Sequence, residues 1–264
     1  MDTERLKIFR PIQVSGLHRM GNTFDGGYVV HFRSLSDADC LVNYGVGYNI
    51  EFEKDFYRTT GKRILAFDPT LSELTPIFKK IKTGQVIPFL RHIKNRVAWI
   101  FEQAKLKRYR IRFYEEGIAL SDSGKYKSLS YHYDKFDLYN KKIILKMDVE
   151  GAEYEVFDDT SVFKLLGNCL QVIIEFHDVS KNLERLISFM ERISKTHSLI
   201  HIHSNNHTGT FTIGGKNIPD TIEMTLLLNE YVPERNYSKA SYPIPGLDHP
   251  CHKLKPDIAL DFFY

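Results

Sequence analysis

The chain has 264 residues, of which 42% are hydrophobic and 26% are charged, as in folded proteins that bury a core. This composition excludes disorder, a collagen helix and a coiled coil as the main architecture. Its 36 basic and 33 acidic side chains leave a formal charge of +3, which is too small to argue for a nucleic-acid partner.

Targeting features are not evident in the sequence. Three cysteines, Cys40, Cys169 and Cys251, form neither a disulfide framework nor a pair with zinc-ligand spacing, which fits a reducing cytosol. The first five residues carry no apolar run of the kind that begins a signal peptide. The longest stretch without Asp, Glu, Lys or Arg, residues 196–215, is rich in His, Asn, Thr and Ser. We therefore expect a cytoplasmic protein with no transmembrane segment.

Short apolar runs alternate with helical patterns along the chain. The apolar runs predict strands over residues 40–44, 63–67, 111–118, 142–147, 170–176, 198–203 and 222–228. Apolar residues at helical spacing predict helices over residues 50–58, 152–166 and 183–194. This alternation predicts an α/β fold in which helices cover both faces of a parallel sheet. Ligands of such sheets bind beyond the carboxyl ends of the strands.

Residues 89–112 interrupt the alternation, because eight Lys or Arg side chains accompany a single acid, Glu102. Their apolar residues fall on one helical stripe, which predicts an inserted amphipathic basic helix. A surface helix packed on the core is the favoured interpretation, and a basic wall for a phosphorylated substrate or a membrane is the alternative. We expect one domain over residues 1–264, with this insertion at 85–110 and a C-terminal extension over 229–264.

A glycine-containing loop, residues 44–47, follows the first sheet strand and precedes a helix. Its two glycines allow the backbone to approach a ligand, and the helix N-terminus offers unpaired N–H groups. Ile50 stands where a dinucleotide-binding loop has its third glycine, which disfavours a nicotinamide enzyme. Asp68 ends the next strand, 21 residues after Gly47. Its carboxylate suits two ribose hydroxyls, and a turn residue is the alternative.

The strand over 142–147 ends in Lys146-Met-Asp148-Val-Glu150-Gly-Ala-Glu153 and runs into a helix. This motif resembles the hallmark of the FkbM-type family of S-adenosylmethionine-dependent methyltransferases. Segments that resemble other parts of the family pattern follow its order, at residues 19–30, 117–122, 174–177 and 201–206. The similarity spans about residues 17–228 and does not include the basic segment.

The resemblance implies a Rossmann-like doubly wound methyltransferase sheet of about seven strands, the last of them antiparallel. It also implies that nine residues contact S-adenosylmethionine: Asp25, Gly26, Gly27, Tyr44, Gly45, Gly47, Asp68, Ile118 and Ala119. The 44–47 loop would border the methionine part, Asp68 the ribose, and residues 118–119 the adenine. Residues 25–27 would close over the amino-acid end or form a plain hairpin turn, because Asp-Gly favours turns.

Strand geometry predicts a polar cluster beside this cofactor. Side chains alternate between the faces of a strand, so Glu175 and His177 share one face, as do His201 and His203. Asp148, Glu175, His177 and His203 would then meet at one cleft, and such a cluster is costly to bury without a function. Asp148, His177 and His203 are therefore the expected catalytic residues. Either a carboxylate or histidine acts as general base, or Asp148, Glu175 and a histidine hold a divalent metal ion.

The connection over residues 204–221 is long for a hairpin, and long connections are often functional. We expect it to cover the acceptor, with Asn205, Asn206 and Glu175 binding the acceptor's hydroxyls. A flexible surface hairpin is the alternative.

The family resemblance implies an O-methyltransferase that acts on a sugar, expected here to be a nucleotide-linked sugar used for surface or capsule polysaccharide. A non-sugar small-molecule acceptor and a non-catalytic cofactor-binding module are the alternatives. Nucleic-acid N-methyltransferases often carry Asn/Asp-Pro-Pro-Tyr after this strand, whereas residues 148–151 read Asp-Val-Glu-Gly, so no nucleic acid is expected.

Overall fold

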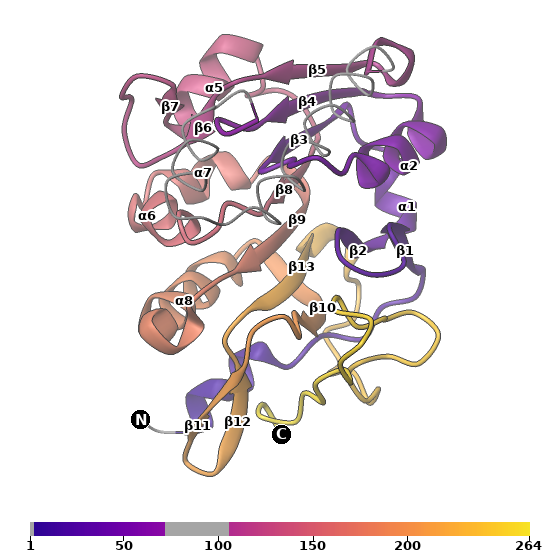
Figure 1. The fold of residues 1–264 in the computed structure, drawn as a ribbon, viewed down its shortest axis with the longest axis vertical. Helices are drawn as coiled ribbons and strands as arrows, with labels where there is room; N and C mark the ends of the chain where they lie inside the picture. The colour runs from indigo at the N-terminus through magenta and orange to yellow at the C-terminus, as the bar shows by residue number, and fades with distance from the viewer. Residues whose placement is uncertain (1–2, 72–105) are drawn as a thin grey trace, which may run out of the picture.

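The structure is a computed structural model that describes residues 3–71 and 106–264. A seven-stranded sheet lies at its centre, in the order β10-β13-β9-β8-β3-β4-β5 (Figure 1). The strands are β3 (Cys40–Tyr44), β4 (Arg63–Phe67), β5 (Ile111–Tyr114), β8 (Ile143–Met147), β9 (Cys169–Phe176), β10 (His197–Ser204) and β13 (Ile222–Leu228). β13, the last in sequence, is antiparallel to both of its neighbours, and the other pairings are parallel. The expected α/β methyltransferase sheet with an antiparallel last strand is confirmed.

Helices cover both faces of this sheet, as Figure 1 shows. One face packs against α1 (Phe32–Leu35) and α2 (Glu51–Thr60). The other packs against α5 (Leu129–Phe136), α6 (Glu153–Asp158), α7 (Val162–Leu166) and α8 (Val179–Ile193). The central strands are mainly apolar because both of their faces are buried, as is usual for parallel sheets, and Lys146, Gln171 and Glu175 are the polar exceptions in β8 and β9.

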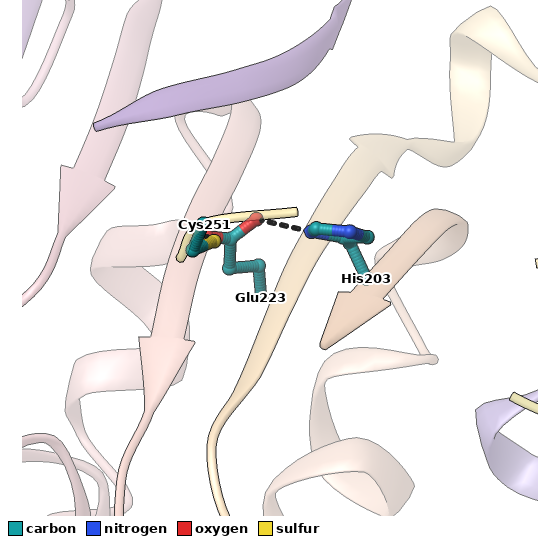
Figure 2. A group of neighbouring side chains, drawn as sticks. All are labelled: His203, Glu223 and Cys251. Atoms are coloured by element: carbon teal, nitrogen blue, oxygen red, sulfur yellow. Dashed lines mark hydrogen bonds and ion pairs between the residues drawn. The ribbon is translucent and has the colours of Figure 1, made fainter. Parts of the chain in front are cut away.

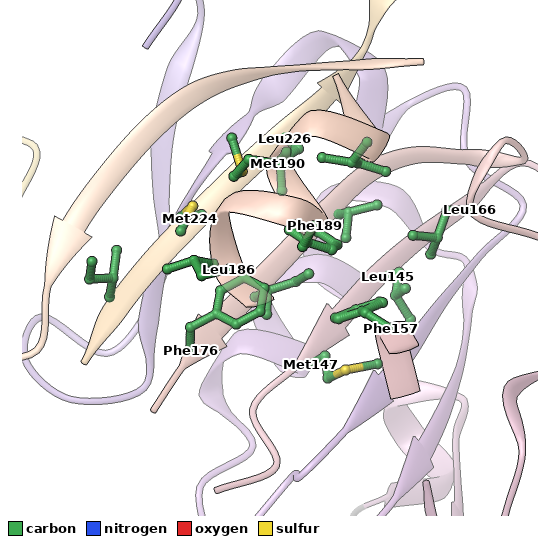
Figure 3. Close-up of a cluster of buried hydrophobic side chains, with 14 of the residues drawn as sticks. Leu145, Met147, Phe157, Leu166, Phe176, Leu186, Phe189, Met190, Met224 and Leu226 are labelled. Atoms are coloured by element: carbon green, nitrogen blue, oxygen red, sulfur yellow. The ribbon is translucent and has the colours of Figure 1, made fainter. Parts of the chain in front are cut away.

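The larger core cluster lies between α6, α7, α8 and the strands β8, β9 and β13 (Figure 3). Phe157 and Phe189 are in contact there, with ring centroids 4.5 Å apart, and Phe176 of β9 packs against both. These rings fix α6 against the sheet, and α6 begins directly after the Asp148–Gly151 turn. The packing therefore sets the position of the turn at the carboxyl end of β8.

Three predicted elements differ from the structure. The strand over 111–118 ends at Tyr114, and β6 (Gly117–Ile118) pairs instead with β7 (Tyr126–Lys127) in a separate sheet. The helix over 152–166 is two helices, because Asp159 adopts an extended conformation after α6. The connection over 204–221 contains a hairpin, β11 (Thr210–Ile213) and β12 (Lys216–Pro219).

The predicted basic helix over 89–112, and the insertion at 85–110, lie mostly outside the described residues. The described end of this segment is the 3₁₀ turn η2 (Lys107–Tyr109), which is followed by β5. The helix therefore does not extend to residue 112.

A second hairpin, β1 (Leu17–Gly21) and β2 (Gly27–His31), lies beside α2 and places residues 22–26 near the sheet edge. Two further 3₁₀ turns are η1 (Thr3–Phe9) and η3 (Asn229–Tyr231). After η3 the chain packs back onto the domain, where Phe262 and Phe263 are buried in the larger core cluster. Within the described ranges, no helix has the length and apolarity that a membrane crossing requires.

Candidate active site

The carboxyl ends of β3, β4 and β8 are in register, so the residues that follow them lie side by side. These residues are Gly45, Asp68 and Asp148. Gly45 adopts a φ of 76°, and a Cβ atom at this position would overlap the carbonyl oxygen of Asp148. Glycine at position 45 thus allows the β3 loop to contact the end of β8 directly.

A cavity of about 520 Å³ opens at this edge of the sheet. Seven of the nine residues assigned to the cofactor line it: Asp25, Gly26, Tyr44, Gly45, Gly47, Asp68 and Ile118. Gly27 and Ala119 do not line it. Gly27 lies instead against the backbone of Asn22 and the guanidinium of Arg19, and the N–H of Ala119 bonds to Lys127. The structure therefore does not place Gly27 or Ala119 among the residues that line the cavity.

Asp68 is buried and its hydrogen bonds connect two loops that line the cavity. One of its carboxylate oxygens accepts a 2.9 Å hydrogen bond from the N–H of Gly47. The other accepts from the N–H and the hydroxyl of Thr70, at 2.8 and 2.7 Å. Asp68 is thus a turn residue as well as a cavity residue, and its two oxygens retain acceptor capacity beyond these three bonds.

Asp148 and Glu175 are joined through Tyr28 of β2. The phenol of Tyr28 lies 2.9 Å from Asp148 Oδ2 and 3.0 Å from Glu175 Oε2. Burial, and then the charges of Asp148 and Glu223, raise the pKa of Glu175 above its usual range. Tyr28 was not expected from the sequence, although it follows the Asp-Gly-Gly segment that the family resemblance includes.

His177 faces the same group of carboxylates. Its backbone N–H and its Nδ1 both lie within hydrogen-bond distance of Glu153 Oε1, at 2.7 and 3.2 Å. Burial lowers the pKa of His177, but the bond to Glu153 and the charges of Glu175, Glu153 and Asp148 outweigh it and raise the pKa to about 9. The structure therefore brings together Asp148, Glu175 and His177, as strand alternation predicts.

Two buried charged residues, Glu53 and Lys146, also line the cavity, and no cofactor role was expected for either from the sequence. Glu53 of α2 is 1% exposed; one oxygen accepts from Asn43 Nδ2, and the other has no partner among the described residues. Burial raises the pKa of Glu53 to about 7, against the effect of Lys146. The ammonium of Lys146 lies 4.3 Å from the centroid of the Tyr28 ring. Asn43, a polar residue within an apolar strand, was the available signal.

His203 does not join this group, which corrects the expectation of a shared cleft. β10 pairs with β13 and not with β9, so Glu223 of β13 stands between His203 and Glu175. One ring nitrogen of His203 lies 3.1 Å from Glu223, to which Cys251 also donates (Figure 2). The other ring nitrogen lies 3.1 Å from Asp257. His203 is 1% exposed and both of its ring nitrogens face carboxylates outside the Asp148 group, so the structure does not support a catalytic role for it.

The two asparagines after β10 bind protein groups. Asn205 donates a 2.7 Å bond to Glu175 and therefore holds that carboxylate in place. Asn206 donates to three carbonyl groups of the C-terminal segment, those of His252, Lys255 and Pro256. Asn206 is thus a structural residue, and we do not retain it as an acceptor ligand.

The hairpin formed by β11 and β12 does not cover the cavity. Its Gly214 turn lies against Thr3, and Lys216 bonds to the carbonyl of Tyr264, so it extends towards the two chain termini (Figure 1). The expectation that residues 204–221 cover the acceptor is therefore wrong for the hairpin.

We expect His203→Ala to lower the free energy of unfolding by about 3–5 kcal/mol at pH 6, because the buried Glu223 and the partly buried Asp257 lose their cation. Burial lowers the pKa of His203, but hydrogen bonds to Asp257 and Glu223 raise it to about 10. The stabilisation is therefore complete below about pH 6.5 and is lost as the pH rises through 10. Urea unfolding between pH 6 and 10 tests this, and His18→Ala, at an exposed position of β1, is the control. A cost that is equal at both pH values would contradict it.

Comparisons with known proteins place this site in context. Residues 39–198 match the family model described as the methyltransferase FkbM domain. No curated protein matches the chain.

Similar solved structures include a fibrillarin pre-rRNA processing protein from Methanococcus jannaschii. It is 8% identical, with 86% of this chain and 76% of that chain covered at a TM-score of 0.39. An rRNA methylase from Streptococcus thermophilus is 12% identical, with 75% and 90% covered at a TM-score of 0.38. A precorrin-6y methyltransferase from Geobacter metallireducens is 11% identical, with 74% and 83% covered at a TM-score of 0.38.

Proposed function

This chain belongs to the FkbM methyltransferase family, and on that premise we propose that it transfers the methyl group of S-adenosylmethionine to a hydroxyl group of a sugar. The observation that carries the choice of a hydroxyl is the Asp148 carboxylate. It lines the cavity with 25% of its side chain exposed, and Tyr28, Glu175 and His177 surround it. A hydroxyl needs help to lose its proton at neutral pH, and this group supplies a base or a cation site.

The cavity offers complementary groups for each part of the cofactor. In our proposal the 45–47 backbone borders the methionine part, Asp68 binds the ribose hydroxyls and Ile118 lies beside the adenine. Asp25 and Gly26 close over the amino-acid end. The buried charges of Glu53 and Lys146 suit the ammonium and carboxylate groups of that end.

The charges around Asp148 support a neutral acceptor. Asp25 and Glu150, both exposed, also line the cavity. Carboxylates accept hydrogen bonds from sugar hydroxyls, whereas they repel a phosphate. If the sugar is nucleotide-linked, as we propose for a surface-polysaccharide precursor, its diphosphate lies away from these residues.

The reaction is an in-line displacement. The acceptor oxygen, held ~3 Å from the methyl carbon, forms the new O–C bond as the S–C bond breaks, and S-adenosylhomocysteine leaves. The acceptor's proton passes to Asp148 or, if a divalent cation is bound, to water. We place this reaction in the cytoplasm, because all three cysteines are free thiols.

Incubation with methyl-labelled S-adenosylmethionine and a panel of acceptors tests the proposal. The panel contains free sugars, nucleotide-linked sugars, phenols, lipids and RNA. Label is expected in a sugar as a base-stable methyl ether. Transfer to any other class with none to sugars would contradict the proposed acceptor, and cofactor binding without any transfer would favour a binding module.

Replacing Asp68 tests the cofactor assignment. Asp68→Ala is expected to weaken S-adenosylhomocysteine binding by about 1.5–3 kcal/mol, or ~10–150-fold, because a charged acceptor of the ribose hydroxyls is lost. Titration calorimetry measures the affinity. Asp68→Asn is the matched control, because its amide oxygen still accepts the hydrogen bonds from Thr70 that shape the turn. Equal affinity in Asp68→Ala and the wild type would contradict the ribose role.

A further inference from the structure

A set of metal-ligand atoms converges at the active site. His177 Nε2 lies 3.8 Å from Asp148 Oδ1, 3.8 Å from Glu175 Oε1 and 3.6 Å from Glu150 Oε2. These separations exceed the 2.7–3.2 Å of a hydrogen bond. They suit neighbouring ligands of one ion, because ligands at ~2.1 Å from Mg²⁺ or Mn²⁺ lie roughly 3–4 Å from one another. We infer that Asp148, Glu175 and His177 bind a divalent cation.

The surroundings of His177 orient it as a ligand. Glu153 is fully buried, and its Oε1 lies 3.2 Å from Nδ1 of His177, while its Oε2 accepts from the N–H of Gly151. With Nδ1 beside Glu153, Nε2 faces Asp148 and Glu175, and an ion bound there would displace the proton from Nε2. Metal-binding histidines commonly have a carboxylate partner of this kind on the nitrogen that does not bind the ion.

The neighbouring carboxylates also favour a cation. Glu175 stands directly opposite Glu223 across β9 and β13, an arrangement of like charges that is unfavourable without compensation. Asn205 donates to Glu175 and Tyr28 lies 3.0 Å from it, but neither carries a positive charge, and the nearest cationic group among the described residues, His177 Nε2, is 3.8 Å away. A ligand set of two carboxylates and one imidazole suits Mn²⁺ or Mg²⁺ better than a thiolate-preferring ion.

A second cluster provides a contrast. His203, Glu223 and Cys251 also bring ligand atoms close together. Their atoms already bond to one another, at 3.1 Å between His203 and Glu223 and 3.3 Å between Cys251 and Glu223 (Figure 2). All three are buried, whereas Asp148 and His177 of the first cluster are partly exposed and Asp148 lines the cavity, so only the first cluster can be reached from it.

The role of the cation rests on the proposed function. Held by Asp148, Glu175 and His177, the ion would supply Lewis-acid chemistry that lowers the pKa of an acceptor hydroxyl beside it. The proton of that hydroxyl would pass to water as its oxygen bonds to the methyl carbon. The oxidation states of the metal and the acceptor do not change.

Binding of Mn²⁺ to the full chain, measured without cofactor or acceptor, tests the site. After dialysis against a chelator, electron paramagnetic resonance counts the bound ion. We expect one Mn²⁺ per chain, and a loss of affinity of ~10-fold or more in Glu175→Gln and in His177→Ala. Glu153→Gln should weaken binding by ~10–100-fold, because only the orientation of His177 changes. Cys251→Ser is the control and should bind as the wild type does.

Three results would overturn the site: no stoichiometric Mn²⁺, unchanged affinity in Glu175→Gln and His177→Ala, or loss of binding in Cys251→Ser. Circular dichroism of each variant confirms that it is folded, and the isosteric Asp148→Asn provides a ligand change of minimal size. The outcomes for the site and for the proposed function are distinct. Methyl transfer that is insensitive to EDTA would contradict the role of the cation and leave the proposed function standing. Mn²⁺ binding without any methyl transfer would contradict the proposed function and leave the metal site standing.

Discussion

Asp148→Asn is expected to lower the rate of methyl transfer by roughly 10²-fold or more while cofactor affinity stays within about twofold. The substitution keeps the size of the side chain and an oxygen that accepts from Tyr28, but it removes the negative charge. Both versions of the mechanism require that charge, since a neutral amide is neither a base nor a strong ligand for a divalent cation. The backbone of Asp148, which contacts Gly45, is unchanged.

Single-turnover kinetics with a confirmed acceptor, together with calorimetry of S-adenosylhomocysteine binding, separates these effects. Asp158→Asn is the matched control, because Asp158 pairs with Arg185 on the surface and does not line the cavity. A near-normal rate in Asp148→Asn would contradict the role of Asp148 as a base or a metal ligand. An equal loss of rate and of cofactor affinity would assign it to binding.

The second large effect is expected for Gly45→Ala, which should cost about 3 kcal/mol or more in the free energy of unfolding and abolish cofactor binding. The added methyl group would overlap the carbonyl oxygen of Asp148, and the φ of 76° is unfavourable for alanine. Relief requires β3 and β8 to separate at the edge where the cofactor is expected.

Gly61→Ala is the control, because it measures the cost of alanine at a positive φ without any overlap of atoms. Gly61 ends α2 with a φ of 66°, and a Cβ atom there would meet nothing within 4 Å. We expect a cost of about 1–2 kcal/mol and normal cofactor affinity. Denaturant unfolding and calorimetry measure both quantities. Equal losses of stability and equal cofactor affinities in the two variants would contradict the importance of the close contact between Gly45 and Asp148.

The strands that carry the site were predictable because their signal is local. β3 and β4 have the bounds that the apolar runs predict, and β8 differs by a single residue. A strand that is buried on both faces is mostly apolar, and a polar residue commonly follows its end. Asp68 and Asp148 therefore stand out in the sequence at the ends of their strands, and the family motif around Asp148 adds the methyltransferase activity.

The order of the strands was decided only by the tertiary structure. From the sequence, His203 and His177 were equally good candidates for a catalytic residue, because each lies at the end of a mainly apolar run. Pairing of β10 with β13 places Glu223 between them, and His203 then belongs to a buried network with Asp257. No local pattern encodes this pairing, because it depends on which apolar faces pack together across the whole chain.

The sequence by itself determined the α/β class, the glycine loop, the acids at the strand ends and the membership of a methyltransferase family. The tertiary structure decided the immediate partners of those acids. Tyr28, Glu53 and Glu153 contact the site from a hairpin and two helices, and a single side chain on such an element has no periodic signature. Their contacts depend on the docking of these elements against the sheet, which is fixed by the packing of core residues far from the site.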